Sequence, residues 1–412
     1  MHLPSLANMF LMAGGHAPAV QDRVQGLALA LLIAAVVAML TRRLRLPYSV
    51  GLVAAGIVLA MFSLGGNFAL SKEIIYVALL PPLLFDAAFH LRLDRLRRNL
   101  PPVAVLATIG VLLSACVCAV GMHFLVHWEW IGALLFGVLI AATDAVSVVE
   151  IFKEAKVHGR LFTLIEGESL FNDGTVVVSL GIVVVLASGR TPTPMEIGFL
   201  LLKVILGGIL CGAAVAIGAL MLAGRTNDRL VEVTFTTVAA YGSFLLADRF
   251  GMSGVLATIT AGIVMSNRRS PDVISQGGKE AIETFWEYLA FVANSLVFLL
   301  IGVHEARQNF IAIWFPALVA IVLTTLARAA AVYSCCFVFH RSSQRVSWQH
   351  QHALLWGGFK GALALALALG LPPDLPARDQ ILAVSFAVVA FSIFVQGLTM
   401  APLLRKMGEI PR

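Results

Sequence analysis

The chain has 412 residues, of which 59% are hydrophobic and only 13% are charged, and its mean hydropathy is +0.91. A soluble protein of this size needs about 25% charged residues to cover its surface. The composition therefore excludes a soluble globular protein and indicates an integral membrane protein. The formal net charge of +6 does not indicate nucleic-acid binding, because the basic residues lie in short loops between apolar stretches.

Apolar segments of about 20 residues, the length of a helix that crosses a ~30 Å hydrocarbon core, follow one another along the chain. They lack the alternation of a membrane β-barrel, so we predict an all-α polytopic membrane protein with about thirteen transmembrane helices. Residues 1–23 lack the basic region of a signal peptide and are predicted to form an N-terminal lead-in. The predicted segments are 24–41, 49–64, 73–90, 100–126, 130–150, 163–188, 195–223, 230–248, 251–267, 281–303, 310–339, 350–371 and 380–404.

The basic residues orient these segments. The chain has 29 lysines and arginines. About twenty of them fall in the loops that follow the odd-numbered segments, and about six fall on the other side. The positive-inside rule therefore predicts that the N-terminus lies outside and the C-terminus is cytoplasmic, in the cell inner (plasma) membrane, with residues 405–412 as a short cytoplasmic tail.

With thirteen segments and an outside N-terminus, segments 1–6 and 8–13 begin on opposite sides of the membrane. We therefore predict two inverted six-helix repeats joined by segment 7, a recurrent plan in secondary transporters. The fifth segment of each repeat has polar or glycine-rich backbone in mid-span, "ATDAVSVVE" at 142–150 and "WGGFKGALAL" at 356–365. We expect both segments, 5 and 12, to be broken crossing helices.

Five charged residues lie deep in the apolar segments, where each costs roughly 2.5–3.5 kcal/mol on insertion scales. Four of these five could share one layer, roughly 9–17 Å from the cytoplasmic edge at 1.5 Å per residue. These four are Asp144, Asp173, Arg328 and Lys360. The five residues are Asp144, Glu168, Asp173, Arg328 and Lys360.

Asp144 and Asp173 are the predicted ion-binding carboxylates. If segment 5 breaks at Asp144, freed backbone groups and the carboxylate can ligate a small monovalent cation; the alternative is a carboxylate held by a local hydroxyl for structure alone. At Asp173 a proton and a cation would compete for one carboxylate, and that competition is itself a mechanism of exchange. The alternative for Asp173 is a helix-capping or packing acid.

The other deep polar residues are predicted to support this site. Glu168 either pairs with Arg328 and fixes two helices together, which we favour, or takes part directly in ion transport. Asn172 lies four residues after Glu168 on the same helical face, where it orients Asp173 or caps exposed backbone, or else makes an ordinary interhelical hydrogen bond. Lys360 would neutralise the negative end of a broken helix in segment 12, or else extend its ammonium to the interface.

Four further acids leave alternatives open. Asp86 either lines an entrance or lies at a segment end, and Glu150, Glu154 and Glu166 either form an acidic cytoplasmic funnel or are simply solvated. Motifs of hydrolases, phosphate-binding loops and ligand-spaced His or Cys clusters do not occur in the sequence. We therefore expect a protein that is not an enzyme and needs no cofactor.

Several stretches together resemble the sodium/proton antiporters of the NhaP/NHE type, cation:proton antiporter family 1. The resemblance covers nearly the whole chain, and its "EGESLFNDG" run is highly specific. The chain departs from the family at Ala145, where proline is usual, and at Lys360, where arginine is commoner. The stretches are "LPYSVGLVAAGIVL", "PPLLFDAAFHLRLDRLRRN", "AATDAVSVVEIFKE", "EGESLFNDGTVVV", "VFLLIG", "TLARAAAVY" and "WGGFKGALALALAL".

The resemblance implies antiport of a monovalent cation (Na⁺, or Li⁺ or K⁺) for H⁺ in a membrane-embedded homodimer that serves pH homeostasis. It implies a dimerisation and scaffold domain, 24–98 with 195–303, and an ion-translocating core, 99–194 with 304–404, that moves like an elevator. Because Asn172 precedes the aspartate, exchange would be electroneutral, one proton for one cation. The implied ion ligands are Asp173, Asp144, Thr143 and Ser169, supported by Asn172, Glu168, Arg328 and Lys360.

Two other functions stay open at this point. The first is a transport-inactive scaffold or ion sensor that kept the fold, although such a protein would be free to lose the five deep charges. The second is an organic-ion carrier, which would need further aromatic or hydrogen-bonding groups near the site.

Overall fold

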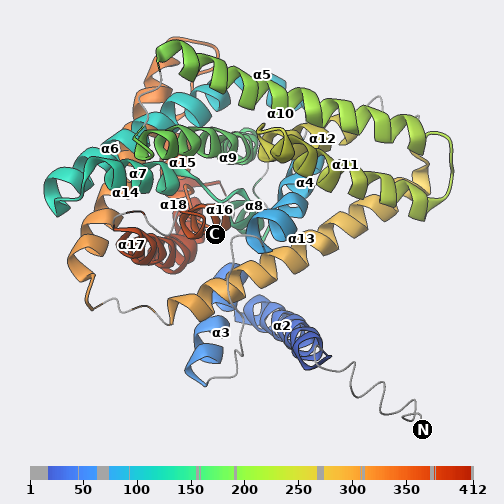
Figure 1. Cartoon of the computed structure of the whole chain (residues 1–412), viewed down its shortest axis with the longest axis horizontal. Helices are drawn as coiled ribbons and strands as arrows, with labels where there is room; N and C mark the ends of the chain where they lie inside the picture. Colours follow the sequence, from blue (N-terminus) through green and yellow to red (C-terminus); the bar gives the residue numbers. More distant parts are fainter. Residues whose placement is uncertain are drawn as a thin grey trace, which may run out of the picture. The chain divides into compact units, whose positions relative to one another are not determined.

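The computed structural model describes residues 17–44, 46–62, 74–91, 93–154, 157, 159–189, 193–266, 273–306, 308, 311–371, 375 and 377–409. Within these ranges the chain forms helices and turns and no β-strand, which confirms the all-α fold class (Figure 1). Expectations for residues 1–16 and 410–412 lie outside the described residues.

Each predicted segment contains helix in its described part. Eight of the described helices are long and apolar enough to cross a membrane, by length and composition. In chain order the elements are α2 (Ala17–Leu44), α3 (Tyr48–Met61), η2 (Ile74–Leu79), α4 (Leu80–His90), α5 (Leu93–Val105), η3 (Leu106–Gly110), α6 (Val111–Val126), α7 (Trp130–Ala141), α8 (Ala145–Glu154), α9 (Arg160–Ala187), α10 (Pro194–Ala223), α11 (Arg229–Arg249), α12 (Gly254–Ser266), α13 (Gln276–Glu305), α14 (Trp314–Val338), α15 (Trp348–Trp356), α16 (Ala362–Leu369), α17 (Arg378–Phe391), η5 (Ser392–Gln396) and α18 (Gly397–Met407).

Three helices extend well beyond the apolar stretches that predicted them. Helix α2 begins at Ala17 rather than at residue 24, α5 begins at Leu93 rather than at residue 100, and α13 begins at Gln276 rather than at residue 281. Hydropathy marks where the apolar side chains end, whereas a helix ends where its backbone groups find other partners. Basic side chains are compatible with helix, so these helices continue through them.

Both predicted interruptions are present. Segment 5 is divided into α7 and α8 by the non-helical residues 142–144, and segment 12 is divided into α15 and α16 by residues 357–361. Segments 4 and 13 contain π-helical turns, η3 and η5, where the backbone ladder is locally widened.

The described residues fall into two compact units. One takes its residues from 1–70 and 295–307, and the other from 71–294 and 308–412. This division by packing does not follow the predicted scaffold and core domains, which stay a prediction.

In the smaller unit α2 packs on α3. The Tyr48 hydroxyl lies 2.8 Å from the Ser295 hydroxyl oxygen, which ties the start of α3 to the end of α13. Gly56 of α3 and Gly302 of α13 lie backbone to backbone, because a Cβ at either would collide with main-chain atoms of the other helix.

The larger unit contains two groups of packed helices joined by α9. In one group α6 packs on α7 and α14, and α17 packs on α14 and α16. In the other group α10, α11, α12 and α4 pack together (Figure 1). Helix α9 contacts α7 of the first group and α4, α10 and α12 of the second, so the "GESLFND" run lies at the junction of both.

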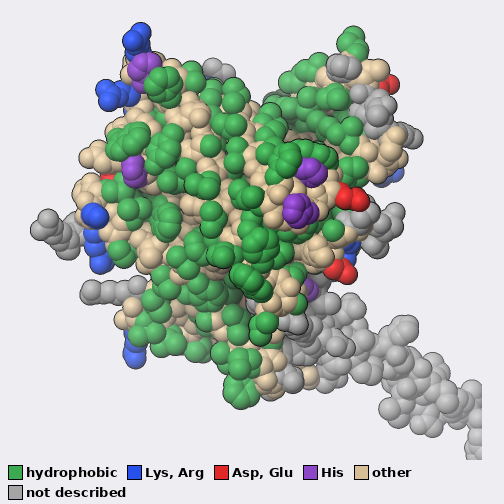
Figure 2. Space-filling model, turned by 90° about the vertical axis from the view of Figure 1, so that its left-hand side faces the viewer, with side chains coloured by type: hydrophobic (Ala, Val, Ile, Leu, Met, Phe, Trp, Pro, Cys, Tyr) green, Lys and Arg blue, Asp and Glu red, His purple; other side chains and the backbone are tan. Residues whose placement is uncertain are grey.

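Apolar side chains cover much of the face shown in Figure 2, and Lys and Arg side chains lie at its margins. Exposed large hydrophobic residues are frequent on α2, α10 and α14. Such surfaces are costly in water and are expected of helices that face lipid.

Candidate functional site

The polar residues of "GESLFND" are buried within α9. Glu168, Ser169 and Asn172 are fully buried, and Asp173 is 6% exposed. The four-residue spacings of Glu168 with Asn172 and of Ser169 with Asp173 place each pair along one side of the helix. The polar groups of this run therefore face packed elements, and each needs a partner there.

The interruption of segment 5 supplies several of these partners through Thr143. Its hydroxyl donates to Ser169 Oγ at 2.9 Å and accepts from Asn172 Nδ2 at 2.7 Å. Its backbone N–H donates to Asn172 Oδ1 at 3.3 Å. Asn172 thus caps exposed backbone of the non-helical stretch, one of the roles expected for it, through hydrogen bonds between two helical segments.

The two broken helices are bonded to each other at their interruptions. The Asp144 N–H donates to the Phe359 carbonyl at 2.8 Å, and the Lys360 ammonium donates to the Ala142 carbonyl at 3.2 Å. These bonds engage the Asp144 N–H and the Ala142 carbonyl, which would form backbone hydrogen bonds of α7 if the helix continued. The break therefore does not require the proline that is usual at position 145 in the family.

The position of Lys360 corrects one prediction. We expected its ammonium to neutralise a broken end within its own segment 12, whereas it lies at the carboxyl end of α7 in segment 5. Free carbonyls give a helix end a partial negative charge that a cation stabilises. Lys360 is 3% exposed, so its ammonium does not extend to the interface either.

Asp144 lies immediately before α8, in the position that caps a helix N-terminus. A negative side chain is stabilised there by the unpaired N–H groups of the first turn. The Ser147 hydroxyl donates to Asp144 Oδ2 at 2.6 Å. Gly361, which precedes α16, lies so close that a Cβ at this position would collide with the Asp144 carboxylate.

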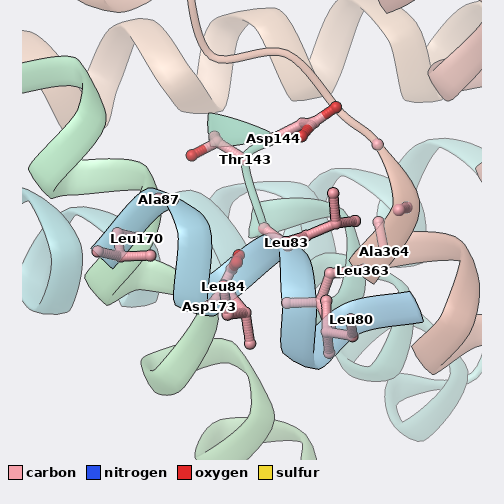
Figure 3. A pocket seen from close by; sticks show the side chains of 13 residues that line it. Leu80, Leu83, Leu84, Ala87, Thr143, Asp144, Leu170, Asp173, Leu363 and Ala364 are labelled. Carbon is pink, nitrogen blue, oxygen red and sulfur yellow. The ribbon is translucent and has the colours of Figure 1, made fainter. Parts of the chain in front are cut away.

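A pocket joins the two predicted ion-binding carboxylates. Asp144 and Asp173 both line it, together with Thr143 from the same interruption and leucines of α4 (Figure 3). Its volume is about 30 Å³, enough for about two water-sized occupants. Asp173 Oδ1 is buried and has no hydrogen-bond partner among the described residues, which makes Asp173 the side chain of this pocket with an oxygen open to a ligand.

Glu168 is held in the ion pair expected from the sequence. Arg328 Nη1 donates to Oε1 and Nη2 donates to Oε2, each at 2.7 Å. The guanidinium also donates to the Leu354 carbonyl of α15, so this bidentate pair connects α9, α14 and α15. Both oxygens of Glu168 are occupied, in contrast to Asp173.

The four charges expected in one layer divide between two cavities. Asp144 and Asp173 line the first, and Arg328 and Lys360 line a second, smaller cavity with Gln396. Residues of the two interruptions, 142–144 in segment 5 and 357–361 in segment 12, line these cavities. The two acids thus line one cavity and the two basic residues line the other.

The remaining acids have varied surroundings. Glu166 is 5% exposed, so it is not a solvated side chain, and Asp86 Oδ1 lies 3.1 Å from a ring nitrogen of His90. The structure does not describe the side chains of Glu150 and Glu154. The acidic funnel therefore stays a prediction.

Sequence reasoning missed three contributors to the site. Ser147 holds Asp144, and its spacing of three residues after an acid at a helix start was an available signal. Ser392 accepts a hydrogen bond from the Lys360 backbone N–H, and no local pattern indicates this long-range contact. The α4 leucines line the pocket, whereas in the sequence they indicate only a membrane-spanning segment.

Comparison with known proteins decides the family. The family described as sodium/hydrogen exchanger, transmembrane, matches residues 29–406. The chain belongs to the sodium/hydrogen exchanger family. Its members are multi-pass membrane transporters rather than enzymes, and the family needs no cofactor, because the transported ions are its substrates.

Two relatives give the extent of the similarity. The Na(+)/H(+) antiporter ApNhaP of Aphanothece halophytica is 37% identical over 89% of this chain and 70% of its own length. The Na(+)/H(+) antiporter NhaP of Pseudomonas aeruginosa is 33% identical over 82% of this chain and 81% of its own length.

A solved structure shows the same fold. The sodium proton antiporter MjNhaP1 from Methanocaldococcus jannaschii superposes with a TM-score of 0.77, covering 94% of this chain and 99% of that chain, at 20% sequence identity. The chain is thus a multi-pass membrane protein with the NhaP fold.

Proposed function

We propose that this protein is a secondary antiporter that exchanges Na⁺ for H⁺, with Asp173 as the carboxylate that binds the two ions in turn. One observation carries the proposal: Asp173 Oδ1 is buried without a hydrogen-bond partner among the described residues, in a pocket that it shares with Asp144. Relatives named as Na⁺/H⁺ antiporters support it from sequence.

The chemistry follows from the oxygen atoms at the site. A dehydrated monovalent cation needs several oxygen ligands, and the carboxylates of Asp173 and Asp144 with the hydroxyl of Thr143 provide this kind of ligand in the pocket. Ser169 does not line the pocket and accepts the Thr143 hydroxyl behind it, so it is proposed as a ligand that the cation reaches only after a local rearrangement. Asp173 and Asp144 lie close enough to interact electrostatically. A cation between them relieves the repulsion of two negative charges, and a proton on Asp173 does the same, so binding of one ion displaces the other.

The stoichiometry proposed is one proton for one cation. Glu168 is committed to Arg328 through both oxygens, and Asn172 is neutral, so within the "GESLFND" run Asp173 is the carboxylate that remains available for exchange. A cycle that moves a proton in one direction and a monovalent cation in the other on one carboxylate transfers no net charge. Li⁺ and K⁺ have the same ligand chemistry as Na⁺ and are proposed as alternative substrates.

Alternating access is proposed to occur by an elevator-like movement of the core, residues 99–194 and 304–404, against a scaffold of residues 24–98 and 195–303. The position of the pocket supports this idea, because its ion-binding residues come from the proposed core and its α4 leucines from the proposed scaffold. We further propose a homodimer in the plasma membrane with the N-terminus outside and the C-terminus in the cytoplasm.

Exchange in proteoliposomes that contain a pH-sensitive dye tests the function. Addition of Na⁺ outside acid-loaded vesicles should raise the internal pH, and Li⁺ and K⁺ are tested in turn. Absence of exchange with every cation would favour a scaffold or sensor, and exchange only with organic cations would favour a carrier. A strong response of the Na⁺-driven rate to an imposed membrane potential would contradict electroneutrality.

A further inference from the structure

The π-helical turn η5 in segment 13 places two buried polar side chains beside the interruption of segment 12. Ser392 is 1% exposed and Gln396 is 7% exposed. The Ser392 hydroxyl donates to Gln396 Oε1 at 2.6 Å. π-Helical turns widen a helix locally and occur frequently at functional sites.

The Ser392 hydroxyl also binds the broken helix. Its oxygen accepts the backbone N–H of Lys360 at 2.9 Å, in the non-helical stretch 357–361 where helical partners are absent. Because the hydroxyl proton is directed to Gln396, a lone pair of the Ser392 oxygen is directed to Lys360. The pair therefore satisfies an N–H that would otherwise be buried without a partner.

The residues on either side of this N–H contact the ion pocket. Phe359 accepts from the backbone of Asp144, and Gly361 lies against the Asp144 carboxylate. The Lys360 side chain reaches the Ala142 carbonyl. A displacement of the backbone at Lys360 would therefore also displace Asp144, because the residues on both sides of Lys360 contact Asp144.

Segment 5 is held by a matching bond. The N–H of Thr143, in the interruption of segment 5, donates to Asn172 in segment 6, as the N–H of Lys360 in segment 12 donates to Ser392 in segment 13. The repeat predicted from the sequence pairs segment 5 with 12 and segment 6 with 13. Each interruption is thus fixed by a polar side chain of the helix that follows it.

We propose that Ser392 and Gln396 are positioning residues that fix the interruption of segment 12 and thereby set the cation affinity of the pocket at Asp144 and Asp173. The pair does not touch the ion. It holds the backbone of Lys360, and through Phe359 and Gly361 it holds the Asp144 carboxylate at ligand distance from the cation. This inference rests on the proposed function of the pocket.

Replacement of Ser392 by alanine tests the proposal. Loss of the hydroxyl leaves the Lys360 N–H unsatisfied, so the interruption rearranges and Asp144 moves. The expected result is a rise of about fivefold or more in the KM for Na⁺, the factor that corresponds to one lost buried hydrogen bond. Maximal rate per folded protein should change much less, and Ser392→Thr, which keeps the hydroxyl, should restore most of the affinity.

Ser385→Ala is the matched control. Ser385 lies in the same segment, is fully buried, and its hydroxyl has no hydrogen-bond partner among the described residues. The control variant therefore removes the same atom without the contact to Lys360, and its KM should stay near that of the wild type. Gln396→Leu, which leaves the Ser392 hydroxyl free to turn, should raise KM in the same direction as Ser392→Ala.

The inference is wrong if Ser392→Ala and Ser385→Ala have the same KM, or if Ser392→Ala lowers only the maximal rate. Na⁺-dependent thermal stabilisation of the detergent-solubilised variants gives a second readout, because a ligand that binds the folded state raises its stability with concentration. If wild-type protein bound Na⁺ but did not exchange it, the proposed function would fail, and the shift in Na⁺ binding between the two serine variants would still decide the inference.

Discussion

Glu168 and Arg328, 160 residues apart in the chain, form a buried bidentate ion pair in which both hydrogen bonds measure 2.7 Å. The pair holds α9 to α14, and the same guanidinium donates to the carbonyl of Leu354 at the end of α15. The two charges of this pair neutralise each other, so the acid of the "GESLFND" run that remains outside the ion pair is Asp173.

Arg328→Ala should destabilise the protein by about 3–5 kcal/mol, because it leaves the buried Glu168 carboxylate unpaired. The measurement is thermal unfolding in detergent. The double variant Glu168→Gln/Arg328→Met should be more stable than Arg328→Ala, since it removes both charges together. A stable Arg328→Ala protein whose main defect is weak cation binding would instead assign Glu168 to transport.

Asp173→Asn should abolish Na⁺/H⁺ exchange while the protein remains folded. The amide keeps the shape of the side chain but can neither release a proton nor supply a negative charge to the cation. Dye-loaded proteoliposomes report the exchange, and size-exclusion chromatography reports the fold. Asp248→Asn is the control, because Asp248 is an exposed acid at the end of α11. Full activity of Asp173→Asn would remove Asp173 from the mechanism.

Asn172→Asp should lower the free energy of unfolding by about 1–3 kcal/mol. The substitution removes the amide N–H bonds to Thr143 and Glu168, and it brings a second negative charge next to Glu168. Thermal unfolding measures the loss. The matched control is Asn99→Asp. It also loses an amide N–H bond, to the Arg95 carbonyl at 2.9 Å, but Asn99 Oδ1 accepts from Arg160 at 2.8 Å and a carboxylate would strengthen that bond. Equal destabilisation by both variants would contradict the explanation.

Gly361→Ala should weaken cation binding, because the added Cβ would collide with the Asp144 carboxylate and one of the two must move. Overpacking of this kind costs about 1–3 kcal/mol of folding stability, and where the Asp144 carboxylate is the group that moves, the KM for Na⁺ should rise. Gly181→Ala is the control, since a Cβ at Gly181 meets no atom within 4 Å. An unchanged KM in Gly361→Ala would mean that Asp144 tolerates displacement.

Much of the architecture was determined by the sequence itself. The run of apolar segments leaves helices as the structure that satisfies every backbone group within one segment in lipid, and the described helices follow those segments. The polar and glycine-rich stretches at 142–150 and 356–365 mark the two interruptions, because such backbone is tolerated at membrane depth only where it is packed in protein or lines a cavity. The cost of burying charges likewise identified the five charged residues at the two interruptions and on α9 and α14, although the described structure also buries Glu166, Glu232 and Glu305.

Only the tertiary structure decided which polar and charged groups form hydrogen bonds and ion pairs with one another. The sequence could not indicate that Lys360 compensates the end of α7 rather than of its own segment, because helix ends from different segments meet only in the folded protein. It also gave no sign that Ser392 binds the Lys360 backbone across 32 residues. Backbone groups freed by an interruption must find partners somewhere nearby, and the packing of segments 5, 6, 12 and 13 determines which side chains are close enough.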